Sequence, residues 1–216
     1  MLHPLSAGDR DLFVSVEQRD GKHSRPLHKS FDCSIMDLAD DISFGVHDLE
    51  DALALRLVNE DDFRELVPKN DCLSFLEELS DKYPKERSND PYGKLIEALF
   101  ADGQTRKHWI SRIVGYLIMN CGIDTLDEFD EPLLRFRAIL MPGPRTFLDA
   151  LTTLVRQRVI LDPSVQHLEF KGQHMVVSVF ETMSTEPEAF LPRDTFELYE
   201  KRGADVRVIC DHIAGM

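Results

Sequence analysis

The stretch DLADDISFGVHDLED, residues Asp37–Asp51, decides the fold, because its apolar and acidic residues both recur at helical spacing. An α-helix turns about 100° per residue, so residues three or four positions apart share one face. On a helical wheel, the side chains that we expect to face the core point in one direction. They are Ile35, Leu38, Ala39, Ile42, Val46, Leu49 and Leu53. The pattern predicts one long helix that begins with Asp32 as N-cap and continues to about Asn59.

The opposite direction of the same wheel is acidic. The side chains that point this way are those of Asp37, Asp40, Phe44, Asp48 and Asp51. Among them, Asp40, Phe44 and Asp48 follow one another at i, i+4 and i+8. Acidic residues opposite a core stripe often form only a solvated face, in which Phe44 would be incidental. Stacked carboxylates repel one another by a few tenths of a kcal/mol per pair, however. A divalent cation or a ligand hydroxyl would relieve that repulsion, and a sugar ring would use the aromatic face. The residues alone leave both interpretations open.

Helical periodicity continues along most of the chain. We expect helices at Asp71–Tyr83, from Asp90-Pro91 onward, at Thr105–Cys121, over Leu133–Leu140, over Arg145–Ile160 and at Ala204–Met216. MPGP at 141–144 predicts a break, Lys171-Gly172 a turn, and Val165–Phe170 a short strand or extended connection. The predicted fold class is therefore all-α and multi-helical, with room for one short irregular β segment.

Composition limits the possible functions. The 216 residues are 43% hydrophobic and 30% charged, which is typical of a soluble globular protein. A formal charge of −14 argues against non-specific binding to duplex nucleic acid, which needs clustered Lys and Arg. No segment has the length of a membrane span, so we expect a cytoplasmic protein without membrane partners. The four cysteines form no CxxC pair, which favours reduced thiols over a zinc ribbon.

LADDISFGVHDLED resembles the helix that closes the active site in HD-domain deoxynucleoside triphosphate triphosphohydrolases, the dGTPase family, where the segment runs approximately ADDIxYxxxDLED. VQHLEFKGQHMVVSVFE, LPRDTFELYEK and VRVICDHIAGM are similar to the same family in the same order. The resemblance extends from about His28 to Met216. It implies an HD-type fold in which residues 1–30 are an irregular lead-in, 31–122 complete the active-site core and 123–216 form a C-terminal helical region.

The resemblance also implies roles for Asp40, Phe44 and Asp48, which we call the acidic line. Asp40 matches the last metal-ligating aspartate, Phe44 a tyrosine that packs on the deoxyribose, and Asp48 the aspartate that reads the sugar 3′-hydroxyl. The implied reaction converts a deoxynucleoside triphosphate such as dGTP, with water, into a deoxynucleoside and tripolyphosphate. A divalent metal, Mg²⁺ or Mn²⁺, lies beside the α-phosphate in this family, and the intact protein is expected to be a homo-oligomer.

Two departures from the family pattern matter. The family's His ligand and His-Asp pair lie far upstream of the ADDI segment, whereas only 39 residues precede Asp40 here. The His47-Asp48 pair lies inside the acidic helix and cannot replace them. We therefore expect a C-terminal fragment with no identifiable catalytic residue, inactive alone and able to bind the metal only together with the missing ligands. The second departure is Phe44 itself, which keeps the tyrosine ring and loses its hydroxyl.

The alternative interpretation is a non-catalytic helical module derived from that family, which binds nucleotide or a partner subunit. A basic cluster of Arg106, Lys107 and Arg112 fits either interpretation, because it can contact polyphosphate or pair with surplus carboxylates.

Overall fold

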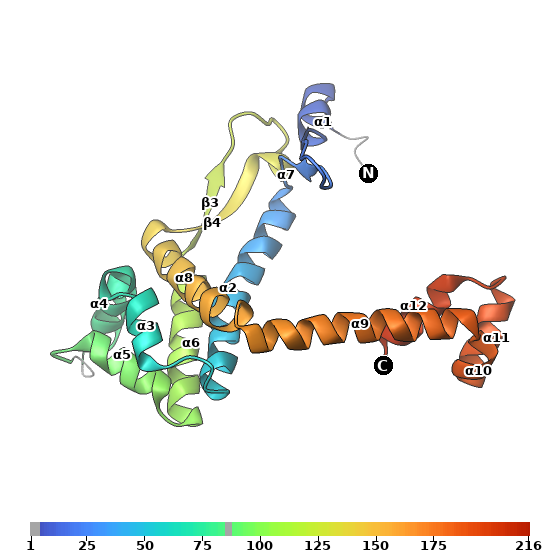
Figure 1. Cartoon of the computed structure of the whole chain (residues 1–216). Coiled ribbons are helices and arrows are strands. Elements are labelled where there is room, and N and C mark those ends of the chain that lie inside the picture. Colours follow the sequence, from blue (N-terminus) through green and yellow to red (C-terminus); the bar gives the residue numbers. More distant parts are fainter. Residues whose placement is uncertain (1–4, 85–87) are drawn as a thin grey trace. The chain divides into compact units, whose positions relative to one another are not determined.

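The computed structural model describes residues 5–84 and 88–216. Their secondary structure is mostly α-helical, and the β structure among them is limited to two antiparallel pairs of short strands (Figure 1). The predicted all-α class is therefore confirmed, with slightly more β structure than expected. None of the described helices combines the length and the apolar character needed to cross a membrane.

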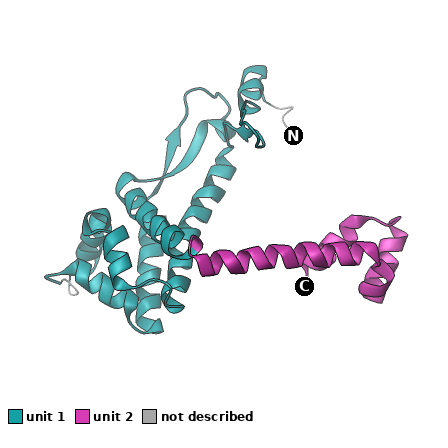
Figure 2. Cartoon of the chain, in the orientation of Figure 1, with its two compact units in different colours: residues 1–159 teal, residues 160–216 magenta. Residues whose placement is uncertain are grey.

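The chain divides into two compact units, residues 1–159 and 160–216 (Figure 2). This division is geometric, and it differs from the predicted boundaries after residues 30 and 122. Those boundaries separate parts by their role in an active site, so they stay a prediction.

The described part of the predicted irregular lead-in contains one short helix and one pair of short strands. Helix α1 (Ala7–Phe13) is capped by Ser6, and strands β1 (Val16–Glu17) and β2 (Arg25–Pro26) pair behind it. The Asp9 carboxylate is buried and accepts backbone N–H groups from Asp130 and Glu131 at 3.2 and 3.0 Å. The lead-in is thereby joined to a distant loop of the same unit.

Helix α2 (Phe31–Ala54) is the predicted long helix, with both ends corrected. Ser30, not Asp32, is the N-cap, because its hydroxyl accepts the N–H of Cys33. The helix ends before Asn59 because Arg56 adopts a left-handed backbone conformation with φ 58°. Asn59 instead caps the next helix, α3 (Glu60–Leu66), in a reciprocal capping box with Asp62.

Helix α2 is held by helix α8 (Pro142–Val155), by helix α6 (Gly103–Met119) and by strand β4 (Phe136–Leu140). Its contact with α8 is close, because Gly45 has no side chain to separate the two helices. Helix α8 packs with its apolar residues Phe147, Leu151, Leu154 and Val155 all buried. The orientation of α2 is thus fixed from three sides.

A second layer of helices completes this unit. The 3₁₀ turn η1 (Lys69–Cys72) leads into α4 (Leu73–Lys82), which packs on α8. Helix α5 (Pro91–Phe100) begins as predicted, with Asp90 as N-cap and proline in the first turn. Asp102 caps α6, which begins at Gly103, two residues before the predicted Thr105.

The prediction of a helix over Leu133–Leu140 was wrong. Only α7 (Pro132–Arg135) is helical there, and β4 follows it, paired with β3 (Cys121–Thr125) in the register Cys121↔Leu140 and Thr125↔Phe136. The break predicted at MPGP is found at Met141, which lies between β4 and α8, and Pro142 already occupies the first turn of α8. Beyond Val155 the chain forms a π-helical segment, η3 (Arg156–Ile160).

The second unit contains helices α9 (Pro163–Thr185), α10 (Pro187–Phe190), α11 (Arg193–Lys201) and α12 (Val206–Ala214). Helix α9 is continuous through Val165–Phe170 and Lys171-Gly172, so the strand and the turn predicted there were wrong. Its C-terminal part packs on α12 and α10. Met183, Leu191 and Ile209 form the buried centre of this unit.

Candidate functional site

The acidic line lies on the outward side of α2. Asp40 is exposed, whereas Phe44 and Asp48 are half-buried. The opposite side of the helix carries its buried residues, which include Leu38, Ile42, Val46 and Leu49. Because that side is fixed against α6, α8 and β4, the three outward side chains are held one helical turn apart on a rigid support. This arrangement is the one that the periodicity predicts.

The aspartates nearest to Asp40 on α2 are engaged in ion pairs. Asp37 pairs with Lys29, and Asp41 pairs with Arg145 on α8 at 2.9 Å. Among the residues that the structure describes, Asp40 has no hydrogen bond or ion pair from its side chain. In the Asp40-Asp41 doublet, the Asp41 carboxylate is therefore fixed by an ion pair, and the Asp40 carboxylate is exposed to solvent.

Asp48 is partly buried and lies near a second carboxylate, that of Asp51. Burial raises the pKa of its carboxyl above the ordinary value of 3.8, and the nearby charge of Asp51 raises it further, against a smaller lowering effect of His47. An ionised Asp48 is thus held in an unfavourable environment. A hydroxyl donating a hydrogen bond to this carboxylate would stabilise the ionised form.

An apolar groove of about 500 Å³ runs along the side of α2 next to Asp40. Helix α2 contributes Ile35, Ala39, Ser43 and His47, and the other wall comes from α6 and the β3–β4 hairpin. Ile35 and Ala39, which we predicted to lie in the core, are exposed here, Ile35 by 46%. They belong to the groove, and the buried stripe of α2 lies to one side of its predicted position.

The described residues do not build a complete metal site. No three His, Cys, Asp or Glu side chains within residues 5–84 and 88–216 are placed to hold one ion. A hard divalent cation takes several oxygen ligands, and Asp40 supplies one carboxylate. The residues present therefore do not fit a metal centre by themselves.

The predicted basic cluster is dispersed in the structure. Arg106 donates to the backbone carbonyls of Leu99 and Ala101 at 2.8 and 2.9 Å, so it closes the C-terminal end of α5. Lys107 is exposed. Arg112 lies over the rings of Tyr83 and Trp109. Neither of the two roles expected for Arg106 is seen, because its partners are carbonyls.

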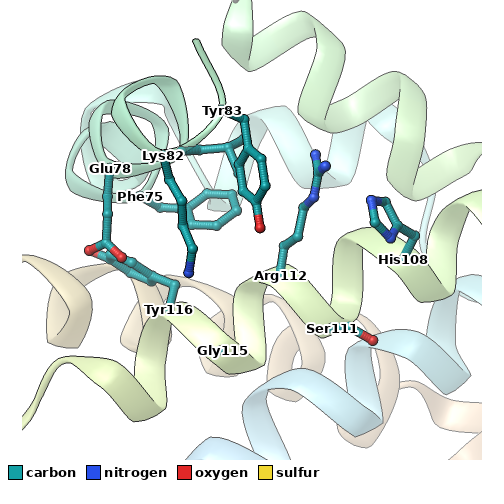
Figure 3. Close-up of a pocket in the computed structure, with 10 residues that line it drawn as sticks. Phe75, Glu78, Lys82, Tyr83, His108, Ser111, Arg112, Gly115 and Tyr116 are labelled. Atoms are coloured by element: carbon teal, nitrogen blue, oxygen red, sulfur yellow. The ribbon is translucent and has the colours of Figure 1, made fainter. Parts of the chain in front are cut away.

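Sequence reasoning missed a polar cleft between α4 and α6, which we call the α4–α6 cleft (Figure 3). It is lined by Phe75, Glu78, Leu79, Lys82, Tyr83, His108, Ser111, Arg112, Gly115 and Tyr116. Its two walls are separate in sequence, and no local motif connects them. Only the helix-spaced recurrence of His108, Arg112 and Tyr116 was visible in advance.

Comparison with known proteins gives two kinds of match. The family model for the phosphohydrolase-associated domain matches residues 140–216. The chain is also 38% identical over 221 residues to the deoxyguanosinetriphosphate triphosphohydrolase-like protein of Shewanella halifaxensis, covering 100% of this chain and 48% of that protein. The proteins of the same description from Pasteurella multocida and Vibrio parahaemolyticus are 37% and 38% identical, and the chain covers 47% and 49% of them.

These matches first define the class, which is that of the HD-domain phosphohydrolases. Within that class the chain belongs to the dGTPase-like family. It spans about half the length of the curated relatives it matches.

Proposed function

We propose that the outward side of α2 forms one wall of a deoxynucleoside triphosphate triphosphohydrolase site, with dGTP as the expected substrate. The observation that carries this proposal is the line of Asp40, Phe44 and Asp48 on a rigid helix, in a chain of the dGTPase-like family. The reaction would release tripolyphosphate and leave the deoxynucleoside.

In this proposal Asp48 and Phe44 bind the sugar. The 3′-hydroxyl donates a hydrogen bond to the Asp48 carboxylate, which is favourable because burial disfavours an ionised Asp48 without a partner. The Phe44 ring packs against the face of the deoxyribose, where a 2′-hydroxyl would otherwise fit. Selectivity for deoxyribose would then come from shape at Phe44 and from the hydrogen bond at Asp48.

Asp40 is proposed as one ligand of a divalent metal, Mg²⁺ or Mn²⁺. Its exposure and its lack of a partner among the described side chains leave both carboxylate oxygens accessible. The remaining ligands would have to come from residues other than those described, in keeping with the match to about half of each relative. We assign no catalytic residue on this chain.

The first experiment uses the chain alone. Incubated with dGTP and Mg²⁺, Mn²⁺ or Co²⁺, it should release no tripolyphosphate above a blank, because one carboxylate does not hold the metal in place. Release that is abolished by Asp40→Ala would contradict the proposed incomplete site.

The second experiment tests the site itself. A chimera in which this chain replaces the matching 48% of the Shewanella halifaxensis relative should hydrolyse dGTP. Asp40→Ala should abolish that activity, and Phe44→Tyr should keep or raise it, since the ring stays and a hydroxyl is added. A chimera that stays fully active with Asp40→Ala would contradict the assignment of Asp40.

A second candidate function is a non-catalytic module that binds nucleotide or a partner subunit. The apolar groove beside α2 favours it, because about 500 Å³ of largely apolar groove is a typical feature of an interaction site. A chimera that folds and binds dGTP but shows no hydrolysis would favour this alternative over the first.

Two further expectations accompany the main proposal. We expect self-association, since α9 exposes Leu168, Phe170, Met175, Val176 and Val177 by more than half. We also expect a cytoplasmic location, because four unpaired cysteines suit a reducing compartment. Sedimentation velocity and cell fractionation would test these two expectations.

A further inference from the structure

The apolar groove beside α2, which we call the α2 groove, is open to solvent although two of its walls continue a buried apolar stripe. On α2, Ile35 is exposed one helical turn from buried Leu38. On α6, Ile118 is 57% exposed and directly follows buried Leu117. Each helix therefore carries a wider apolar face than the described fold covers. Such a surface is typical of a site that binds another apolar surface.

The β3–β4 hairpin closes the α2 groove with an apolar face of its own. Ile123 and Ala138 lie directly opposite each other in the strand register, so their side chains share one face of the hairpin. Both residues line the groove, and Ile123 is 66% exposed. Two helices and a hairpin thus present apolar side chains to one volume of about 500 Å³. A groove of this kind accepts the apolar face of an amphipathic segment.

The chemistry of the α2 groove suits a polypeptide better than a nucleotide. None of the described residues that line it is an aspartate, glutamate, lysine or arginine, and the polar ones among them are Ser43, His47 and Cys121. A polyphosphate requires cationic side chains such as lysine and arginine. Apolar side chains, in contrast, gain free energy when such walls remove them from water. We therefore expect the occupant to be an apolar polypeptide segment.

The rim of the α2 groove runs directly alongside the acidic line. Ala39, Ser43 and His47 line the groove at i, i+4 and i+8, and each is followed in the sequence by a member of the acidic line. The two rows of side chains are therefore about 100° apart around the same helix. A segment seated in the groove would lie beside the acidic line along its whole length, and thus beside Asp40.

The comparison with relatives indicates where such a segment could come from. The chain covers 48% of the Shewanella halifaxensis protein, so about half of that relative has no counterpart in this sequence. The described residues also leave a metal site incomplete around Asp40. A part of the family's chain that packs into the α2 groove would bury its apolar walls and bring further residues to Asp40.

A second copy of this chain fits the α2 groove less well. In a two-fold contact the same surface of both copies meets, so the two acidic lines beside the groove would approach each other. Like charges brought together in this way oppose association. The formal charge of −14 per chain adds to that repulsion.

We propose that the α2 groove is the docking surface for the part of a dGTPase-like chain that this chain does not cover. That part inserts apolar side chains between α2, α6 and the β3–β4 hairpin, and its neighbouring residues lie beside Asp40. The placement beside Asp40 gains its purpose from the proposed function, in which Asp40 is one of several metal ligands. The docking itself rests on the groove and on the relatives.

The main experiment uses the chimera described above, with cleavable linkers where this chain joins the rest of the Shewanella halifaxensis protein. After cleavage, sedimentation velocity should show that the two parts stay together. Ile118→Glu should raise their dissociation constant roughly tenfold or more, because it buries a carboxylate among apolar side chains. Leu55→Glu alters an exposed leucine just after α2 that does not line the groove, so it should leave the dissociation constant unchanged. In the chain alone, both variants should keep the parent's urea midpoint, because both residues are already exposed.

Thiol modification gives a second measurement that needs no cleavage. Cys121 lines the groove and is exposed in the chain alone. In the uncut chimera its reaction with a thiol reagent should be roughly tenfold slower, because docking covers it. Cys210 lies in the second unit, does not line the groove and serves as the reference thiol.

Several results would overturn the docking. These are parts that separate after cleavage, equal effects of Ile118→Glu and Leu55→Glu, and a Cys121 rate that is the same in the chimera and in the chain alone. A chimera that does not fold would also reject it, since the groove would then not fit the relative's part. A dimer of the chain alone that Ile118→Glu dissociates would assign the groove to a second copy instead.

Hydrolysis of dGTP separates this proposal from the proposed function. Cleaved parts that stay together without hydrolysis would reject the proposed reaction and support the docking. Hydrolysis by the cleaved chimera that Ile118→Glu does not reduce would reject the docking and keep the reaction. Asp40→Ala should abolish hydrolysis and leave the association of the two parts intact.

Discussion

Arg145 on α8 donates two hydrogen bonds to the same carboxylate oxygen of Asp41 on α2, from Nη1 at 2.9 Å and from Nη2 at 3.0 Å. The contact joins residues that are 104 positions apart. Arg145 also reaches Asp149 one turn further along α8, at 3.3 Å. Asp41 therefore belongs to the packing of two helices, while its sequence neighbour Asp40 does not.

The two members of the aspartate doublet should consequently respond differently to mutation. Asp41→Asn should lower the free energy of unfolding by about 0.5 kcal/mol, since the pair is roughly half exposed and Arg145 keeps Asp149. Asp40→Asn should leave the stability unchanged or raise it by a few tenths of a kcal/mol, because a carboxylate near Asp37 is removed. Urea unfolding of both variants measures this difference. A larger loss in Asp40→Asn than in Asp41→Asn would show that Asp40 has a structural role.

Gly45 is required by the close approach of α2 and α8. A Cβ at this position would lie 2.5 Å from Cδ1 of Leu148 and 3.0 Å from Oγ1 of Thr152. Leu148 is only 1% exposed, so its side chain has no space into which to move. Gly45→Ala should therefore destabilise the protein by about 1–3 kcal/mol, despite the higher helix propensity of alanine.

Gly172 provides the matched control within helix α9. A Cβ there meets nothing within 4 Å, and the residue lies in the middle of a continuous helix. Gly172→Ala should therefore stabilise α9 by about 0.5–1 kcal/mol. Thermal unfolding followed by circular dichroism compares the two variants. Destabilisation by Gly172→Ala would indicate a turn at Lys171-Gly172 instead of a helix.

The contrast between these glycines shows what the sequence could predict about the fold. Helix starts with a capping side chain next to proline, such as Asp90-Pro91, were predictable because the signal is local. Helix α9 was not recognised, because an isolated glycine is tolerated inside a helix and the pattern alone does not reveal it. Strand β4 was also missed, because its conformation depends on pairing with Cys121–Thr125, which periodicity within Phe136–Leu140 does not contain.

For the two candidate sites as well, the sequence could predict only what depends on a single element. The line of Asp40, Phe44 and Asp48 was predictable, since all three lie on one helix and helical spacing sets their direction. The α4–α6 cleft was not, because its lining residues come from two helices that pack together only in the folded chain. Sequence periodicity orients side chains on one element, whereas sites built from two elements require the tertiary fold.

Asp48 should make the stability of the protein depend on pH in a characteristic direction. Its pKa in the folded protein is raised above 3.8, so the folded state favours the protonated carboxyl. This contribution is present at acidic pH and is lost as the pH rises from about 3.8 through the folded-state pKa. Asp48→Asn, which cannot ionise, should be closest to the parent protein in stability at acidic pH and should gain relative to it toward neutral pH. Urea midpoints measured for both proteins across this range provide the test. A variant that is less stable than its parent at neutral pH would show that ionised Asp48 has a stabilising partner.

The four thiols should react in a defined order. Burial raises the pKa of Cys72 to about 12, with a smaller contribution from Asp71, and the side chain is 0% exposed. Cys33, Cys121 and Cys210 are all exposed residues, but partial burial of the Cys121 thiol raises its pKa, and this thiol donates to the carbonyl of Leu117 at 3.4 Å. Because the thiolate is the reactive form, an aromatic disulfide reagent should modify Cys33 and Cys210 first, Cys121 more slowly, and Cys72 only on unfolding. Mass spectrometry of samples quenched at successive times gives the order, and the rate at Cys72 should follow the concentration of urea. Rapid modification of Cys72 in the native protein would mean that the core beneath α4 opens far more readily than its packing predicts.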